Sequence, residues 1–167
     1  KDKILITGAA GFIGSALSNK FLENEYDVIG IDNLNNYYDI ELKKARLKYI
    51  VKTSENLSSK WTFYNASIEN SIQIEEIFNS ENPNIVVNLA AQAGVRYSLT
   101  NPSSFTATNL VGFGNILEVC RKTSVKHLVY ASSSSVYGGN ELLPYNEKHS
   151  VDHPVSLYAA TKKANEL

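Results

Sequence analysis

Short apolar runs of strand length alternate with helix-length stretches along the whole chain, and this alternation restricts the possible folds more than any other feature. The runs Ile4–Ile6, Ile85–Val87 and Leu128–Tyr130 are continuous, which is typical of parallel strands covered on both faces. The pattern predicts an α/β fold with a doubly wound parallel sheet and right-handed crossovers. The expected strands are Lys3–Thr7, Val28–Asp32, Trp61–Ala66, Ile85–Leu89 and His127–Ala131.

The stretches between these strands carry apolar residues at helical spacing. The expected helical faces are Ile13, Leu17, Phe21 and Leu22; then, from Ser71, Ile74, Ile77 and Phe78; and, from Ser103, Phe105, Leu110, Phe113, Ile116, Leu117 and Cys120. The polar stretches Asn33–Asp39 and Thr53–Lys60 are expected to be loops.

The composition is that of an ordinary globular domain and argues against several function classes. The 167 residues are 43% hydrophobic and 20% charged with a net charge of −1, which gives no basic footprint for nucleic acid. A single cysteine, Cys120, excludes an internal disulfide and is expected to be a small buried hydrophobe. No apolar run approaches the ~20 residues that span a bilayer. We expect a cytoplasmic protein with no membrane or nucleic-acid partner and no metal site.

Two features indicate that the chain is incomplete. It contains no methionine, and it stops at Leu167 inside an amphipathic helical pattern without a stop signal. We therefore expect residues 1–167 to form one domain that is incomplete at its C-terminal end.

The first expected strand runs directly into three glycines, Gly8, Gly11 and Gly14, that open the first helix. At such a junction one glycine makes the tight turn, one lets the backbone approach a pyrophosphate, and one packs the helix on the strand. The helix N-terminus adds free N–H groups and the positive end of its dipole. The spacing differs from the standard Gly-x-Gly-x-x-Gly, so a purely structural glycine turn is the alternative.

Asp32 closes the second expected strand, 24 residues after Gly8. A carboxylate there would accept hydrogen bonds from the adenosine ribose hydroxyls and would repel a 2′-phosphate, which favours NAD over NADP. The alternative is an aspartate that only begins a turn. Together with the glycines, Asp32 predicts an NAD-binding domain of the Rossmann type.

Tyr158 and Lys162 are four residues apart in a segment expected to be helical, so both project from one face. The Lys162 ammonium and an oxidised nicotinamide would favour the phenolate, which could remove a hydroxyl proton while hydride leaves the same carbon. A serine run, Ser132–Ser135, follows the fifth expected strand, at the edge where parallel sheets place ligands. Ser133 is the candidate to bridge the substrate hydroxyl and Tyr158, and a plain serine-rich loop is the alternative.

Together these motifs resemble the extended short-chain dehydrogenase/reductase family, and within it the nucleotide-sugar epimerases. The resemblance extends over essentially all 167 residues and rests on Thr7–Gly14, Ile31–Asn33, Asn88–Gln92, Ser132–Gly138 and the pair Tyr158 and Lys162. Further segments are similar to the UDP-glucuronate 4-epimerases: Tyr37–Asp39, Lys43–Leu47, Ala91–Ser98, Asn101–Pro102, Asn109–Phe113 and Tyr158–Leu167.

The resemblance implies a role for each matching position. Tyr158 would take the proton from the sugar 4-hydroxyl while C4 gives hydride to NAD, and the hydride would return to the opposite face of the 4-keto sugar. The catalytic residues would be Ser133, Tyr158 and Lys162. Cofactor contacts would come from Gly8, Gly11, Phe12, Ile13, Gly14, Asp32, Asn33, Ser67, Ile68, Leu89, Ala90, Ala91, Gln92, Asn109, Ala131, Tyr158 and Lys162. Substrate contacts would come from Arg96, Ser133, Ser134, Ser135 and Tyr158.

The resemblance also implies the reaction and the assembly. The substrate would be a UDP-sugar, with UDP-glucuronate converted to UDP-galacturonate for polysaccharide biosynthesis, and Arg96 would face its charged part unless it is a plain surface arginine. A homodimer would form through two long helices, one starting near Ser103 and one including Tyr158. A second, C-terminal domain would hold the UDP, so residues 1–167 alone would not turn over.

Two departures from the family pattern concern Asn88, which stands where histidine is usual, and Ser67-Ile68, which stand where Asp and an aliphatic residue contact adenine.

A nucleotide-sugar 4,6-dehydratase would need an acid and a base where Ser134 and Ser135 stand, and a UDP-glucuronate decarboxylase usually has a glutamate in that run. UDP-glucose or an N-acetylated sugar remains an alternative substrate. A non-catalytic dinucleotide sensor on the same fold is the alternative outside the enzymes.

Overall fold

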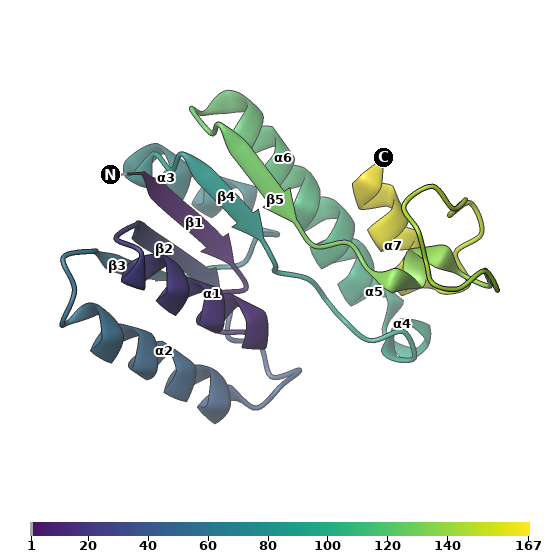
Figure 1. Ribbon diagram of the computed structural model, residues 1–167, viewed down its shortest axis with the longest axis horizontal. Coiled ribbons are helices and arrows are strands. Elements are labelled where there is room, and N and C mark those ends of the chain that lie inside the picture. Colours follow the sequence, from purple (N-terminus) through teal and green to yellow (C-terminus); the bar gives the residue numbers. More distant parts are fainter. Residues whose placement is uncertain (1) are drawn as a thin grey trace.

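The computed structural model describes residues 2–167, and Lys1, the first residue of the predicted domain, lies outside them. Within these residues five parallel strands form one sheet in the order β3-β2-β1-β4-β5 (Figure 1). The strands are β1 (Lys3–Thr7), β2 (Asp27–Asp32), β3 (Trp61–Asn65), β4 (Ile85–Asn88) and β5 (His127–Tyr130). The predicted doubly wound parallel sheet is confirmed, with strand ends within one residue of those expected.

Helices cover the two faces of the sheet because successive strand residues point to opposite sides. On one face α1 (Phe12–Glu23) and α2 (Ile40–Ser54) bury Ile4, Ile6, Leu22 and Ile50. On the other face α3 (Ser71–Glu81) and α6 (Phe113–Lys122) bury Leu5, Ile29, Phe78 and Ile116. The strand order reverses between β1 and β4, which is the topological switch point where α/β sheets bind ligands.

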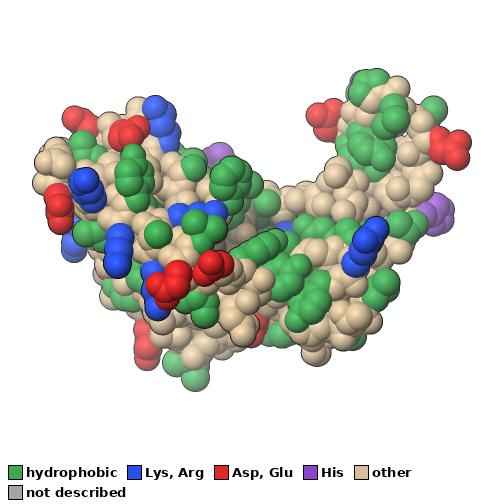
Figure 2. Space-filling model, turned by 90° about the horizontal axis from the view of Figure 1, so that it is seen from below, with side chains coloured by type: hydrophobic (Ala, Val, Ile, Leu, Met, Phe, Trp, Pro, Cys, Tyr) green, Lys and Arg blue, Asp and Glu red, His purple; other side chains and the backbone are tan. Residues whose placement is uncertain are grey.

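The second half of the chain builds a lobe at the carboxyl edge of the sheet. After β4 come α4 (Tyr97–Thr100), α5 (Pro102–Phe105) and a π-helical turn, η1 (Thr106–Gly112), which runs directly into α6. After β5 come a 3₁₀ turn, η2 (Ser134–Tyr137), and α7 (Leu157–Glu166). The long connection between η2 and α7 projects from the body, and Figure 2 shows a hollow between this projection and the rest of the molecule.

Three details of the predicted helices are wrong. Leu110 and Leu117 are 37% and 46% exposed, because the face that packs against α3 contains the predicted Ile116 together with Val119. Ile13 is 62% exposed, since the first turn of α1 lines an open cavity at the carboxyl edge of the sheet. The loop expected from Thr53 begins only after Ser54, where α2 ends, and α2 itself was not predicted.

The outer strand β5 also differs from the prediction of strands covered on both faces. Leu128 packs against the α3–α6 side of the core, but its neighbour Val129 is 45% exposed. Within residues 2–167 only one face of β5 is therefore covered. Cys120 packs against the same core, and burial raises the pKa of its thiol to about 11. No helix of these residues combines the length and the apolar character that crossing a membrane requires.

Candidate functional site

A cavity of about 400 Å³ opens at the carboxyl edge of the sheet, at the switch point between β1 and β4. It is the place where the topology brings together most of the predicted cofactor residues. The predicted residues in its lining are Gly8, Gly11, Phe12, Ile13, Gly14, Asp32, Asn33, Ser67, Ile68, Leu89, Ala90, Ala91, Gln92, Ala131, Tyr158 and Lys162.

The glycine turn is shaped by close backbone contacts. Gly8 has a φ of +71°, and a Cβ added there would meet the backbone nitrogen of Ala90 at 2.9 Å. A Cβ at Gly14 would lie 2.1 Å from the carbonyl oxygen of Gly8. The amide of Gly11 donates to that same oxygen at 3.0 Å, which closes the turn. Only glycine fits at Gly8 and Gly14, because backbone atoms occupy the space a side chain would need.

The N-terminus of α1 is left without a side-chain cap. Gly11 provides no capping hydrogen bond and no acidic residue stands in the first turn, whereas Asp39, Asn70 and Ser156 cap α2, α3 and α7. The first amides of a helix have no partner within the helix, and the helix dipole makes that end positive. The end of α1 therefore presents unpaired amides and a positive dipole end to the cavity, and these features would fit a diphosphate.

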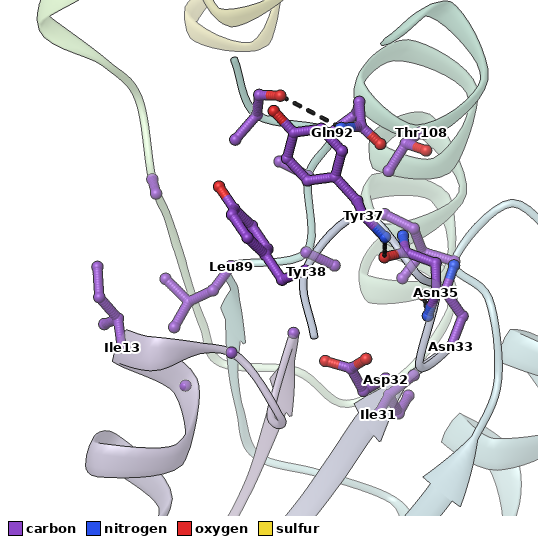
Figure 3. Close-up of a pocket in the computed structure, with 18 of the residues that line it drawn as sticks. Ile13, Ile31, Asp32, Asn33, Asn35, Tyr37, Tyr38, Leu89, Gln92 and Thr108 are labelled. Atoms are coloured by element: carbon purple, nitrogen blue, oxygen red, sulfur yellow. Dashed lines mark hydrogen bonds between the residues drawn. The ribbon is translucent and has the colours of Figure 1, made fainter. Parts of the chain in front are cut away.

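Asp32 lies at the end of β2, points toward the cavity and is only 8% exposed (Figure 3). Its carboxylate accepts hydrogen bonds from the amides of Ala10, at 3.1 Å, and Leu34, at 2.9 Å. A carboxylate has about four acceptor positions, so two remain for the hydroxyls of a ribose. The buried Lys43 of α2 lies 3.8 Å from the same carboxylate.

The loop after β2 crosses the cavity, and sequence reasoning gave its aromatic residues no role. Figure 3 shows Tyr37 and Tyr38 extending over the cavity, opposite Ile13 and Leu89. The centroids of the Tyr37 and Tyr97 rings are 5.0 Å apart. Burial raises the pKa of the Tyr37 hydroxyl. The segments Tyr37–Asp39 and Lys43–Leu47 carry part of the family resemblance, which was the available signal. The remaining lining residues not predicted are Ile31, Asn35, Tyr38, Lys43, Ala66, Ala93, Thr108 and Ser132.

Tyr158 and Lys162 reach the cavity from the first two turns of α7. The Tyr158 ring packs edge-on against Phe105, with 6.1 Å between the ring centroids. The Lys162 ammonium donates to the carbonyl oxygen of Ala131 at 3.0 Å, which ties α7 to the end of β5. Lys162 is only 5% exposed, and this burial lowers the pKa of its ammonium.

The predicted substrate residues lie outside the lining of this cavity, apart from Tyr158. The Ser133 hydroxyl donates to that of Ser135 at 3.0 Å and accepts from the Ser135 amide at 3.2 Å, capping η2. Ser132 lines the cavity in place of the three serines that follow it. Arg96 is exposed at the start of α4. The described residues thus assemble the cofactor side of the predicted site more completely than its substrate side.

Asn109 is predicted to support the cofactor site and lies buried behind it, in the middle of η1. Its side chain accepts from the backbone amide of Gln92 at 2.8 Å and donates to the backbone carbonyl of Gln92 at 3.0 Å. The side chain also donates to the Thr161 hydroxyl at 3.1 Å. The backbone carbonyl of Asn109 accepts from the Asn165 side-chain amide at 2.8 Å. One side chain therefore joins the wall of the cavity after β4 to α7, which carries Tyr158.

We expect Asn109→Ala to lower the free energy of unfolding by roughly 2–5 kcal/mol, because it leaves the buried amide and carbonyl of Gln92 without partners. Chemical denaturation measures the loss. The control is Asn56→Ala, whose amide contacts only a carbonyl on the surface and whose loss is expected to change stability by less than ~0.5 kcal/mol. Equal stability of the two variants would contradict the role given to Asn109.

Lys162 is expected to make stability depend on pH in the alkaline range. Burial lowers its pKa in the folded state below its ordinary 10.5, so between the two values the unfolded state binds more protons. The free energy of unfolding therefore gains a contribution that rises with pH through this window and is constant below it. Denaturation of Lys162→Met across the window should lack this rise. The exposed Lys148→Met should retain it.

The family model described as GDP-mannose 4,6 dehydratase matches residues 5–167. The chain therefore belongs to that family, and the sequence resemblance to the extended short-chain dehydrogenase/reductases that act on nucleotide sugars is confirmed.

Curated proteins and solved structures match over nearly the whole chain. Protein CapI of Staphylococcus aureus is 53% identical over 165 residues, covering 99% of this chain and 48% of CapI. UDP-glucuronate 4-epimerase 1 of Arabidopsis thaliana is 44% identical, covering 98% of this chain and 37% of that protein. The UDP-glucuronic acid 4-epimerase of Bacillus cereus, solved with UDP-glucuronic acid and NAD, is 32% identical with a TM-score of 0.85, covering 98% and 50%. Structures of UDP-glucose 4-epimerases match as well. The chain spans about half the length of CapI and a smaller share, 37%, of the plant protein.

Proposed function

We propose that this chain is the cofactor-binding half of an NAD-dependent UDP-sugar 4-epimerase that converts UDP-glucuronate to UDP-galacturonate. One observation carries the proposal: a single cavity joins the uncapped end of α1 and Asp32 to Tyr158 and Lys162. Binding of a dinucleotide needs an anion-binding helix end and a carboxylate such as Asp32. Removal of a hydroxyl proton beside the nicotinamide needs a pair such as Tyr158 and Lys162. The relatives and solved structures named for 4-epimerases, several of them holding NAD, support the same assignment.

The chain's own residues supply binding, orientation and proton transfer. The amides of the first turn of α1 would hold the diphosphate, and the free acceptor positions of Asp32 would hold the adenosine ribose. NAD, when bound, supplies the hydride acceptor and donor. The Lys162 ammonium, fixed by the Ala131 carbonyl, lies in the same cavity as the Tyr158 hydroxyl. In the proposed reaction the Tyr158 side chain takes the proton of the sugar 4-hydroxyl while C4 gives hydride to NAD, and it returns the proton when the hydride comes back.

The glucuronate specificity is supported by sequence relatives rather than by the cavity. UDP-glucuronate 4-epimerases of Arabidopsis are 42–44% identical to this chain. Arg96, exposed at the start of α4, is the proposed reader of the sugar carboxylate. The proposed epimerase would also contain a C-terminal domain, form a homodimer and act in the cytoplasm in polysaccharide biosynthesis. The mass of the full-length protein in solution tests the dimer.

A 4,6-dehydratase is the second candidate, because the matching family model carries that description. Elimination of water needs an acid and a base beside the catalytic serine. Ser134 and Ser135 occupy those positions and can supply neither at neutral pH, which favours epimerisation. The same absence of a glutamate argues against a UDP-glucuronate decarboxylase.

The test uses the full-length protein, supplied with UDP-glucuronate and no added NAD, with the sugar anomeric proton followed by NMR. Appearance of UDP-galacturonate is the expected result. Conversion of UDP-glucose or UDP-N-acetylglucosamine instead would retain the mechanism and remove the role of Arg96. A dehydrated or decarboxylated product would replace the epimerase by one of the alternatives. NAD binding without any conversion would favour a dinucleotide sensor.

A further inference from the structure

We propose that Lys43 sets the preference between NAD and NADP by neutralising Asp32 at the ribose end of the cavity. This inference rests on the proposed NAD site and goes beyond it. Asp32 alone predicts strong exclusion of a 2′-phosphate, because a buried carboxylate repels a dianion. The structure places a buried cation beside that carboxylate, which changes the expected electrostatics.

Lys43 is built into the site rather than lying on its surface. It is 6% exposed, lines the cavity and comes from the first turn of α2. Its ammonium donates to the backbone carbonyl of Asn35 at 3.0 Å and to the Asn35 side chain at 3.1 Å. The same ammonium lies 3.8 Å from the Asp32 carboxylate. Two contacts therefore hold it on the loop after β2, with one side turned toward Asp32.

The pair leaves this end of the cavity close to electrically neutral. Buried charges at this separation interact much more strongly than exposed ones, so the field of the Lys43 ammonium offsets that of the Asp32 carboxylate. Arg46 adds a second cation one turn along α2, where it donates to the Ala10 carbonyl at 3.3 Å and lies over the Phe12 ring. A 2′-phosphate would therefore meet a carboxylate paired with the Lys43 cation, not the carboxylate alone.

Two opposite expectations follow for the two members of the pair. Lys43→Gln unmasks the Asp32 charge, so discrimination against NADP should increase about tenfold, as expected from the loss of one nearby charge. Asp32→Asn unmasks the Lys43 charge, so the preference should move toward NADP by at least about tenfold. In the double variant Asp32→Asn/Lys43→Gln the gain for NADP should be lost. An aspartate acting alone predicts no specific effect of Lys43.

The experiment incubates the full-length protein with NAD and a large excess of NADP until bound and free dinucleotides equilibrate, then measures the NADP to NAD ratio released on denaturation. The matched control is Lys44→Gln, the next residue on α2, which is exposed and pairs with Glu41. Lys44→Gln should leave the ratio within about twofold of wild type, since screened surface charges contribute little.

A fall in the ratio for Lys43→Gln together with an unchanged ratio for Lys44→Gln supports the inference. An unchanged or higher ratio for Lys43→Gln overturns it, as does an equal fall in both variants. These two single variants decide the question even if the Asp32 variants fail to fold. Failure of the wild-type protein to bind either dinucleotide would instead overturn the proposed function, and with it the site on which this inference rests.

Discussion

Tyr158→Phe is expected to lower the kcat of the full-length protein by about 10²- to 10⁴-fold, the usual contribution of a general acid–base group. The substitution removes only the hydroxyl and keeps the ring that packs against Phe105. Binding of NAD should be retained, because the end of α1, Asp32 and Lys162 are unchanged. The NMR assay with UDP-glucuronate measures kcat, and the dinucleotide released on denaturation measures occupancy.

The matched control for this prediction is Tyr49→Phe, which removes the hydroxyl of an exposed tyrosine on α2. It should retain the wild-type kcat and the wild-type NAD content. A Tyr158→Phe protein with near-normal kcat would assign the proton transfer to another group. A Tyr158→Phe protein that no longer holds NAD would make Tyr158 a binding residue instead, and the fall in kcat would then say nothing about chemistry.

The parts of the site that could be predicted from sequence are those that depend on local geometry. The glycine turn places Gly8, Gly11 and Gly14 at a strand-to-helix junction, and the backbone contacts at that turn explain why no other residue fits at Gly8 and Gly14. The spacing of Tyr158 and Lys162 follows from one helical turn. These motifs place the candidate site at the carboxyl edge of the sheet from the sequence alone.

The parts that could not be predicted depend on contacts between distant segments. In the sequence Lys43 is one of several charged residues on a polar helix, and only the packing of α2 beside β2 buries it next to Asp32. Tyr37 acquires its position through Gly94 and Tyr97, which follow it by more than 50 residues. Sequence periodicity carries no information on such pairings, because it describes one element at a time.

The errors in the predicted core have the same origin. Helical spacing assigned Leu110 and Leu117 to the same face as Ile116, but packing against α3 buries Ile116 and Val119 and leaves Leu110 and Leu117 partly exposed. Apolar character alone assigned β5 two covered faces, but within residues 2–167 the core packs only on the Leu128 side and Val129 stays exposed. In both cases the neighbouring element, not the residue's own hydrophobicity, decides burial.

Gly14→Ala is expected to destabilise the protein by about 3 kcal/mol, the upper end of the usual cost of overpacking, because the turn cannot yield. The added Cβ would lie 2.1 Å from the Gly8 carbonyl oxygen and 2.9 Å from its carbon. Both are backbone atoms, and Gly8 is itself held against Ala90. α1 must move away from the turn, which also displaces the amides proposed to hold the diphosphate. Tm should fall by roughly 6–12 °C for a domain of this size, and NAD occupancy should fall with it.

The control is Gly114→Ala, the same substitution in an exposed position on α6, where an added Cβ meets no atom within 4 Å. Alanine has the higher helix propensity, so this variant should gain about 0.5–1 kcal/mol rather than lose stability. Thermal unfolding of both variants with and without NAD separates the two effects. If Gly14→Ala retained wild-type Tm and NAD occupancy, the close packing of α1 on the turn would not be required, and the anion-binding role of that helix end would need another explanation.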